Sequence, residues 1–194
     1  MEHLLNYSSD LKPSGHLEVI KIFPDGTEEV HFSDSNVICS GLGLTLLQAF
    51  SNSGTGDISP YQITYFQLGV SGTSGLQVSS NGALGSPIAS GDYGAPLSFE
   101  IDNHDLLNEG STTAQCFGII PWAYIKKVSA TRVQYQIFAD ENTCNSLDLT
   151  EIGLFSKNPL QTADEGSTLC AYRYFPALSK TSAFSLLFRW TIEF

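Results

Sequence analysis

The chain ends on the segment FSLLFRWTIEF, which covers residues 184 to 194. Its large apolar side chains fall on every second position: Phe184, Leu186, Phe188, Trp190, Ile192 and Phe194. This alternation predicts a strand that turns all of them to one face. A terminal segment usually frays unless packing holds it. We therefore expect this strand to lie in the core of a sheet structure, with Phe194 reaching the surface or a subunit contact.

Further strands are predicted along the chain. HLEVIKIFPDGTEEVHF at 16–32 has two strand-forming runs around Pro24, Asp25 and Gly26, which is the turn chemistry of a hairpin. TRVQYQIFA at 131–139 alternates, with Val133, Tyr135 and Ile137 on one face. Shorter runs of strand-forming residues lie at 61–69, 116–125, 147–156 and 167–176. These patterns predict an all-β fold, an antiparallel, Greek-key-like β-sandwich of roughly seven to nine strands.

One helix is expected between the first hairpin and the strand at 61–69. Leu42, Leu46 and Phe50 recur at helical spacing after Ser40, a residue type that favours helix N-caps. Gly41 and Gly43 lie within this segment and weaken the pattern, so the helix should be short.

The segment from 69 to 95 is rich in Gly and Ser and is longer than an ordinary connection. It is predicted to be an extended loop or arm that meets a partner. Its large apolar side chains form the candidate interface: Leu76, Val78, Leu84, Ile88 and Tyr93. With this arm as an insertion, residues 1–194 are expected to form a single domain.

The charge of the chain limits its partners. The formal net charge is −11 at pH 7, and binding to nucleic acid needs clustered Lys and Arg. No apolar run is long enough to span a bilayer, and the N-terminal residues lack the pattern of a signal peptide. We therefore expect no nucleic-acid or membrane partner and production in a cytosol. The widely spaced cysteines, Cys39, Cys116, Cys144 and Cys170, are expected to be buried free thiols.

No catalytic motif is apparent. The histidines, His3, His16, His31 and His104, lie in no motif that places a base beside a nucleophile or a metal. Two acidic stretches have irregular spacing for Ca²⁺; they contain Asp102, Asp105 and Glu109, and Asp140, Glu141 and Asp148. We expect no enzymatic activity, no catalytic residue, no cofactor and no metal site.

The segments LTEIGLFSKNPL and STLCAYRYFPALSKTSAFSLLFRWTIEF follow one another near the end of the chain. Together they resemble the C-terminal half of structural proteins from tailed-bacteriophage virions, with those of cyanophages closest. Upstream, SNVICSGLGLTLLQAF and YQITYFQLGVSG resemble the opening of the same proteins. The resemblance covers residues 17–70 and 128–194 and carries folding motifs only. The apolar motif residues Ile152, Leu154, Phe155 and Trp190 are expected in the core.

The resemblance implies a non-enzymatic subunit of a tail, neck or baseplate. Such a protein would be assembled in the host cytoplasm, and its partners would be other virion proteins and copies of itself. A capsid decoration protein is one alternative. Another is a carbohydrate-binding module for host recognition, for which Trp122 and Tyr124 would form the exposed aromatic platform.

Overall fold

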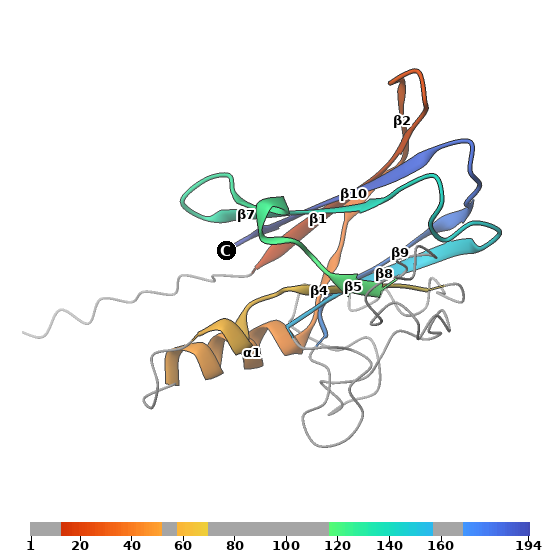
Figure 1. Cartoon of the computed structure of the whole chain (residues 1–194). Helices are drawn as coiled ribbons and strands as arrows, with labels where there is room; N and C mark the ends of the chain where they lie inside the picture. Colours follow the sequence, from red (N-terminus) through yellow and green to blue (C-terminus); the bar gives the residue numbers. More distant parts are fainter. Residues whose placement is uncertain (1–12, 52–57, 70–116, 157–168) are drawn as a thin grey trace, which may run out of the picture.

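The computed structural model describes residues 13–51, 58–69, 117–156 and 169–194, and the statements below concern these residues. Two five-stranded antiparallel sheets pack face to face (Figure 1). The first sheet has the order β2-β1-β10-β7-β6, and the second has the order β3-β9-β8-β4-β5. The predicted β-sandwich is therefore confirmed, and its two five-stranded sheets exceed the expected seven to nine strands by one.

The first sheet contains the predicted hairpin and the terminal strand. Its strands are β1 (Ser14–Ile22), β2 (Glu28–Ser35), β6 (Ile125–Lys127), β7 (Arg132–Ala139) and β10 (Ser185–Glu193). In the β1–β2 turn, Gly26 has a φ of 83°, a conformation that glycine adopts readily. The Asp25 carboxylate accepts a hydrogen bond of 2.9 Å from the Thr27 amide and so closes the turn.

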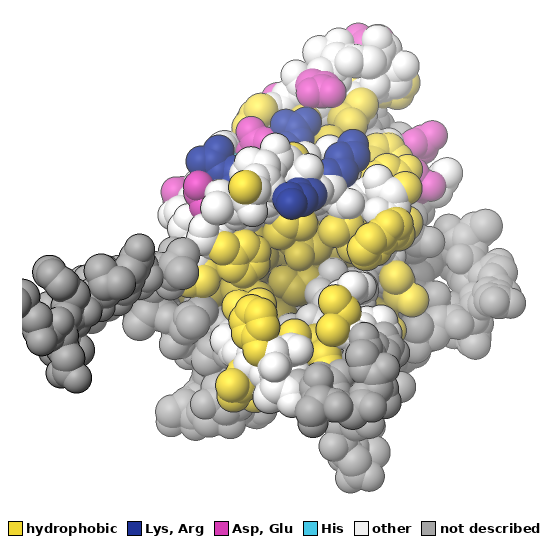
Figure 2. Space-filling view, turned by 90° about the vertical axis from the view of Figure 1, so that its left-hand side faces the viewer, with side chains coloured by type: hydrophobic (Ala, Val, Ile, Leu, Met, Phe, Trp, Pro, Cys, Tyr) yellow, Lys and Arg dark blue, Asp and Glu magenta, His cyan; other side chains and the backbone are white. Residues whose placement is uncertain are grey.

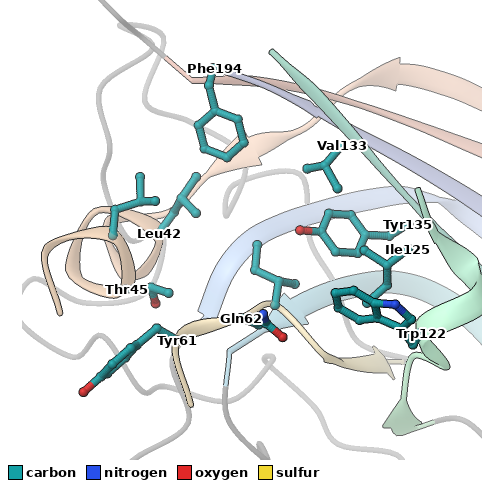
Figure 3. A pocket seen from close by; sticks show the side chains of 11 residues that line it. Leu42, Thr45, Tyr61, Gln62, Trp122, Ile125, Val133, Tyr135 and Phe194 are labelled. Carbon is teal, nitrogen blue, oxygen red and sulfur yellow. The ribbon is translucent and has the colours of Figure 1, made fainter. Parts of the chain in front are cut away.

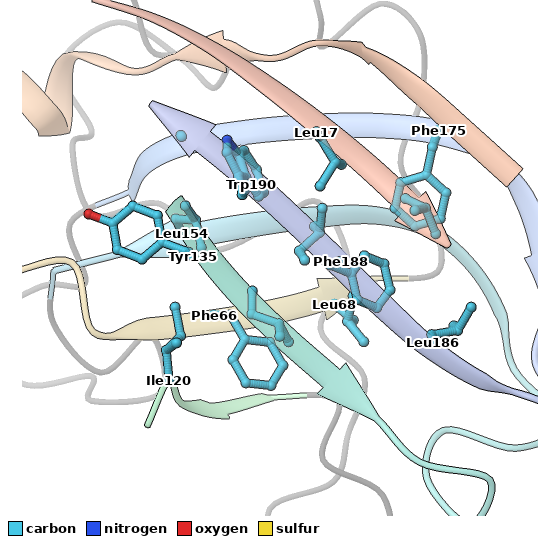
Figure 4. Packing of buried hydrophobic residues seen from close by; sticks show 14 of the residues in the cluster. Leu17, Phe66, Leu68, Ile120, Tyr135, Leu154, Phe175, Leu186, Phe188 and Trp190 are labelled. Atoms are coloured by element: carbon cyan, nitrogen blue, oxygen red, sulfur yellow. The ribbon is translucent and has the colours of Figure 1, made fainter. Parts of the chain in front are cut away.

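β10 lies at the centre of the first sheet, between β1 and β7. Its inward side chains Leu186, Phe188, Trp190 and Ile192 are completely buried, and they meet the second sheet across the core (Figure 4). The expectation for the terminal segment is thus confirmed. Pairing on both edges and burial on one face hold this strand in place.

The second sheet contains β3 (Val37–Ile38), β4 (Tyr65–Gly69), β5 (Phe117–Ile119), β8 (Asp148–Phe155) and β9 (Leu169–Ser179). The expected core residues Ile152, Leu154 and Phe155 of β8 are all fully buried. β3, β5 and β6 have only two or three residues each, so the periodicity of the sequence could not separate them from neighbouring turns.

The predicted helix is α1 (Ser40–Ser51), which packs against β9. Leu42 is buried, but Phe50 is 86% exposed, so the apolar stripe is covered only in its first part. Two single 3-10 turns, η1 (Ser59–Tyr61) and η4 (Trp122–Tyr124), precede β4 and β6. Of the predicted arm at 69–95, only Gly69 is within the described residues.

Candidate interaction site

An apolar groove opens at the end of the sandwich where β7 begins and β10 ends. Its volume is about 240 Å³. Side chains from α1, the segment around η1, η4, β6, β7 and the last residue line it, and Figure 3 shows them facing a common space. The lining residues are Leu42, Thr45, Leu46, Tyr61, Gln62, Ile63, Trp122, Ile125, Val133, Tyr135 and Phe194. We call this feature the groove, and the end of the sandwich that contains it the open end.

The outer wall of the groove is formed by η4 and β6. Pro121 precedes η4 with φ −58° and ψ 138°, and its carbonyl accepts a hydrogen bond of 2.8 Å from the Tyr124 amide. This tight turn leaves Trp122 on the surface with 71% of its area exposed. Ile125 follows at the start of β6 and is half-buried beside it. A large aromatic side chain thus borders an apolar hollow, an arrangement typical of binding surfaces.

The deep wall of the groove belongs to the first sheet. Tyr135 of β7 is buried next to its strand partner Trp190, and Val133 lies nearer the mouth. The Phe194 amide donates a hydrogen bond of 2.9 Å to the Thr131 carbonyl, which holds the last residue at this end. The Phe194 side chain is 37% exposed at the mouth. This position agrees with the expectation that the end of the chain reaches the surface.

The opposite wall is the buried side of α1. Leu42 and Leu46 turn toward the groove, and the Thr45 hydroxyl donates a hydrogen bond of 3.2 Å to the Ser156 hydroxyl. The Thr45 oxygen also lies 3.7 Å from the sulfur of Cys170. These polar contacts join the helix to the end of β8 and to β9.

The edge of the groove is positively charged. Within the described residues, the exposed side chains of Lys126 and Lys127 of β6 make no hydrogen bond or ion pair. Lys127 lies on the same side of the strand as Ile125 of the groove, and Lys126 lies on the other side. The other described cations are paired with carboxylates, apart from the buried Lys180; they are Lys21, Arg132, Arg173 and Arg189. Figure 2 shows the apolar band at this end below a row of Lys and Arg side chains.

The far end of the sandwich is closed by polar contacts. The buried ammonium group of Lys180 donates hydrogen bonds to the Asn145 side-chain oxygen at 3.1 Å and to the Thr181 carbonyl at 2.8 Å. Burial lowers the pKa of Lys180, while the carboxylates of Asp140 and Glu141 act in the opposite direction. We call this region, with the 140–147 loop and the 180–184 turn, the closed end.

The closed end also holds the β1–β2 hairpin. Phe23 packs edge-on against the buried Phe184, with ring centroids 6.0 Å apart. Beyond this contact the hairpin stands out from the sandwich (Figure 1). Val30 of β2 is 57% exposed there, and Glu28 lies two residues earlier on the same strand face. The side chain of Glu28 is exposed and makes no hydrogen bond or ion pair with the described residues.

A buried carboxylate lies on the outer face of the second sheet. Glu151 is completely buried and accepts a hydrogen bond of 2.7 Å from the Tyr172 hydroxyl. Burial, and then this bond, raise the pKa of Tyr172. Gly69 is the strand partner of Glu151, and a Cβ at Gly69 would overlap the Glu151 side chain.

The expectation of four free thiols is partly wrong. Cys39 and Cys170 are buried thiols that form no disulfide bond, and burial raises the pKa of Cys170 to about 11. Cys144, however, forms a disulfide bond, which the wide spacing of the cysteines in the sequence did not predict. Cys116 lies outside the described residues.

Some of the other residues singled out in the sequence lie within the described residues, and the rest lie outside them. Trp122 and Tyr124 are both exposed, but only Trp122 lines the groove. His16 contacts the Ser33 hydroxyl and His31 the Pro176 carbonyl, each at 3.0 Å. The following lie outside the described residues: Leu76, Val78, Leu84, Ile88, Tyr93, His3, His104, Asp102, Asp105 and Glu109.

The described residues contain no group of three His, Cys, Asp or Glu side chains that could hold a metal ion. Nor do they include a helix long and apolar enough to cross a membrane. The sequence did not predict the groove, because its walls come from segments that are distant in the chain. The one available signal was Trp122 beside Pro121, which placed an aromatic side chain next to a turn.

No family model, no curated protein and no solved structure matches the chain.

Proposed function

We propose that the protein is a non-enzymatic structural subunit of a tailed-bacteriophage virion, present in several copies in the tail, neck or baseplate. The observation that carries the proposal is the open end, where the described residues leave an apolar groove of about 240 Å³ and an exposed tryptophan. When another protein covers such a surface, apolar area is removed from water and the free energy of the system falls. The sequence resemblance to virion proteins is the reason for proposing a phage particle as the assembly.

The test is mass spectrometry and cryo-electron microscopy of phage particles produced from the genome that encodes the chain. We expect the protein in several copies around the tail axis, with the open end against a neighbouring subunit. Density on the capsid surface would favour the decoration-protein alternative. Absence of the protein from purified particles would overturn the proposal.

A carbohydrate-binding role is the second candidate, because Trp122 offers an exposed ring beside a hollow. Aromatic side chains of this kind can stack on the apolar face of a sugar. Glycan-array binding that is lost in Trp122→Ala and kept in Tyr124→Ala would favour this role. Equal and negligible binding by all three proteins would exclude it.

A further inference from the structure

We propose that copies of this chain associate head to tail, with the β1–β2 hairpin of one copy covering the groove at the open end of the next. The inference rests on the proposed role as a repeated subunit, and it names the two surfaces that would join the copies.

The charges at the open end argue against a symmetric contact between two open ends. Lys126 and Lys127 are exposed without partners, while the nearby carboxylate of Glu193 already pairs with Arg132 at 3.0 Å. A two-fold contact places the same patch on both sides, so it would bring these lysines toward one another. The surface that covers the groove should instead carry carboxylates.

The β1–β2 hairpin has the required chemistry. It combines the exposed apolar side chain of Val30 with the unpaired carboxylate of Glu28, and Asp25 and Glu29 add negative charge close by. Glu29 is already paired with Lys21 at 2.8 Å, which leaves Glu28 as the carboxylate free to meet a lysine of another copy. Val30 is the side chain that would enter the apolar hollow.

The positions of the two surfaces permit repetition. Strand β1 pairs with β10 so that Ser14 lies opposite Glu193 and Ile22 opposite Ser185. The hairpin therefore lies at one end of these strands and the groove at the other. A contact between two different surfaces leaves one of each free on every pair, so association continues into a ring or a filament.

The experiment compares the full-length chain with charge-reversal variants by light scattering after size exclusion and by sedimentation equilibrium. We expect the unaltered chain to form species larger than a dimer as its concentration rises, and high salt to weaken them. Lys126→Glu/Lys127→Glu and Glu28→Lys should each weaken association about tenfold or more, because each brings like charges together.

Two further proteins make the result specific. A chain that carries both sets of reversals should recover association, since opposite charges again face one another. The control variants Ser182→Glu and Asn142→Lys make smaller charge changes of the same signs at exposed closed-end positions outside the hairpin, and they should associate like the unaltered chain. Circular dichroism and thermal unfolding would establish that all variants fold.

A chain that remains monomeric at every concentration, or a Lys126→Glu/Lys127→Glu variant that associates unchanged, would overturn the head-to-tail contact. A protein that occupies a particle but shows either result would retain the proposed function without this contact. Recovery of association by the combined variant, with no protein found in purified particles, would support the head-to-tail contact and overturn the proposed function.

Discussion

The two ends of the sandwich bury their apolar residues in different ways. At the closed end, Phe184 is covered by Phe23, and the Lys180 ammonium group satisfies the carbonyl oxygens around it. At the open end, Trp122 and Phe194 border a groove and remain partly exposed, and the side chains of Lys126 and Lys127 have no partner among the described residues. The closed end is completed within the chain, whereas the open end has the composition of a surface that another protein covers.

The largest effect is expected in the strand that joins the two ends. Trp190→Ala removes a fully buried side chain from the centre of β10 and should lower the free energy of unfolding by about 3–5 kcal/mol. Denaturant unfolding followed by circular dichroism measures this value. A loss below about 1 kcal/mol would contradict the placement of β10 in the shared core.

Alkaline pH tests whether water reaches deep into the open end. Cys170 lies behind Thr45 of the groove wall, and burial raises its pKa from 9.0 to about 11. Because the unfolded thiol ionises first, the stability from this buried thiol is complete below pH 9 and is lost as pH rises toward 11. Its contribution should fall by about 1.4 kcal/mol per pH unit in this range.

Cys170→Ala is the comparison for the alkaline experiment, since other buried groups such as Tyr135 and Tyr172 also have raised pKa values from burial. The free energy of unfolding should decline less steeply in the variant than in the unaltered chain. Equal slopes would show that the thiol is solvated and that the groove extends into the core.

Two lysine substitutions compare the ends directly. Lys180→Met leaves the acceptors of Asn145 and Thr181 without their donor and should destabilise the fold by about 1–3 kcal/mol. Lys127→Met alters an exposed, unpaired side chain and should change stability by no more than about 0.5 kcal/mol. Equal losses in thermal unfolding would mean that the closed end does not depend on this lysine.

The smallest effect on stability is expected at the tryptophan of the open end. Trp122→Ala should change the free energy of unfolding by only about 0.5 kcal/mol, because 71% of the side chain is exposed. Its association with partner copies should nevertheless weaken. A stability loss comparable with that of Trp190→Ala would show that Trp122 belongs to the core instead.

The sequence predicted the regular parts of this molecule well and the groove poorly. Alternation identified β10 and β7, and the Pro24-Asp25-Gly26 turn identified the hairpin, because each pattern is local. The groove depends on how α1, η4 and the last residue meet, and no local pattern contains that information. The burial of Lys180 was also missed, since a lysine in a turn normally lies in solvent.

The two tryptophans of the chain allow a direct test of the open end as an interaction surface. Trp190 is completely buried and Trp122 is 71% exposed, so iodide should quench the fluorescence of Trp122 almost alone. A Trp122→Phe variant, with little quenchable emission, verifies this assignment. We predict strong quenching in the dilute subunit and protection in the assembled form. Equal quenching in both states would contradict an interface at the open end.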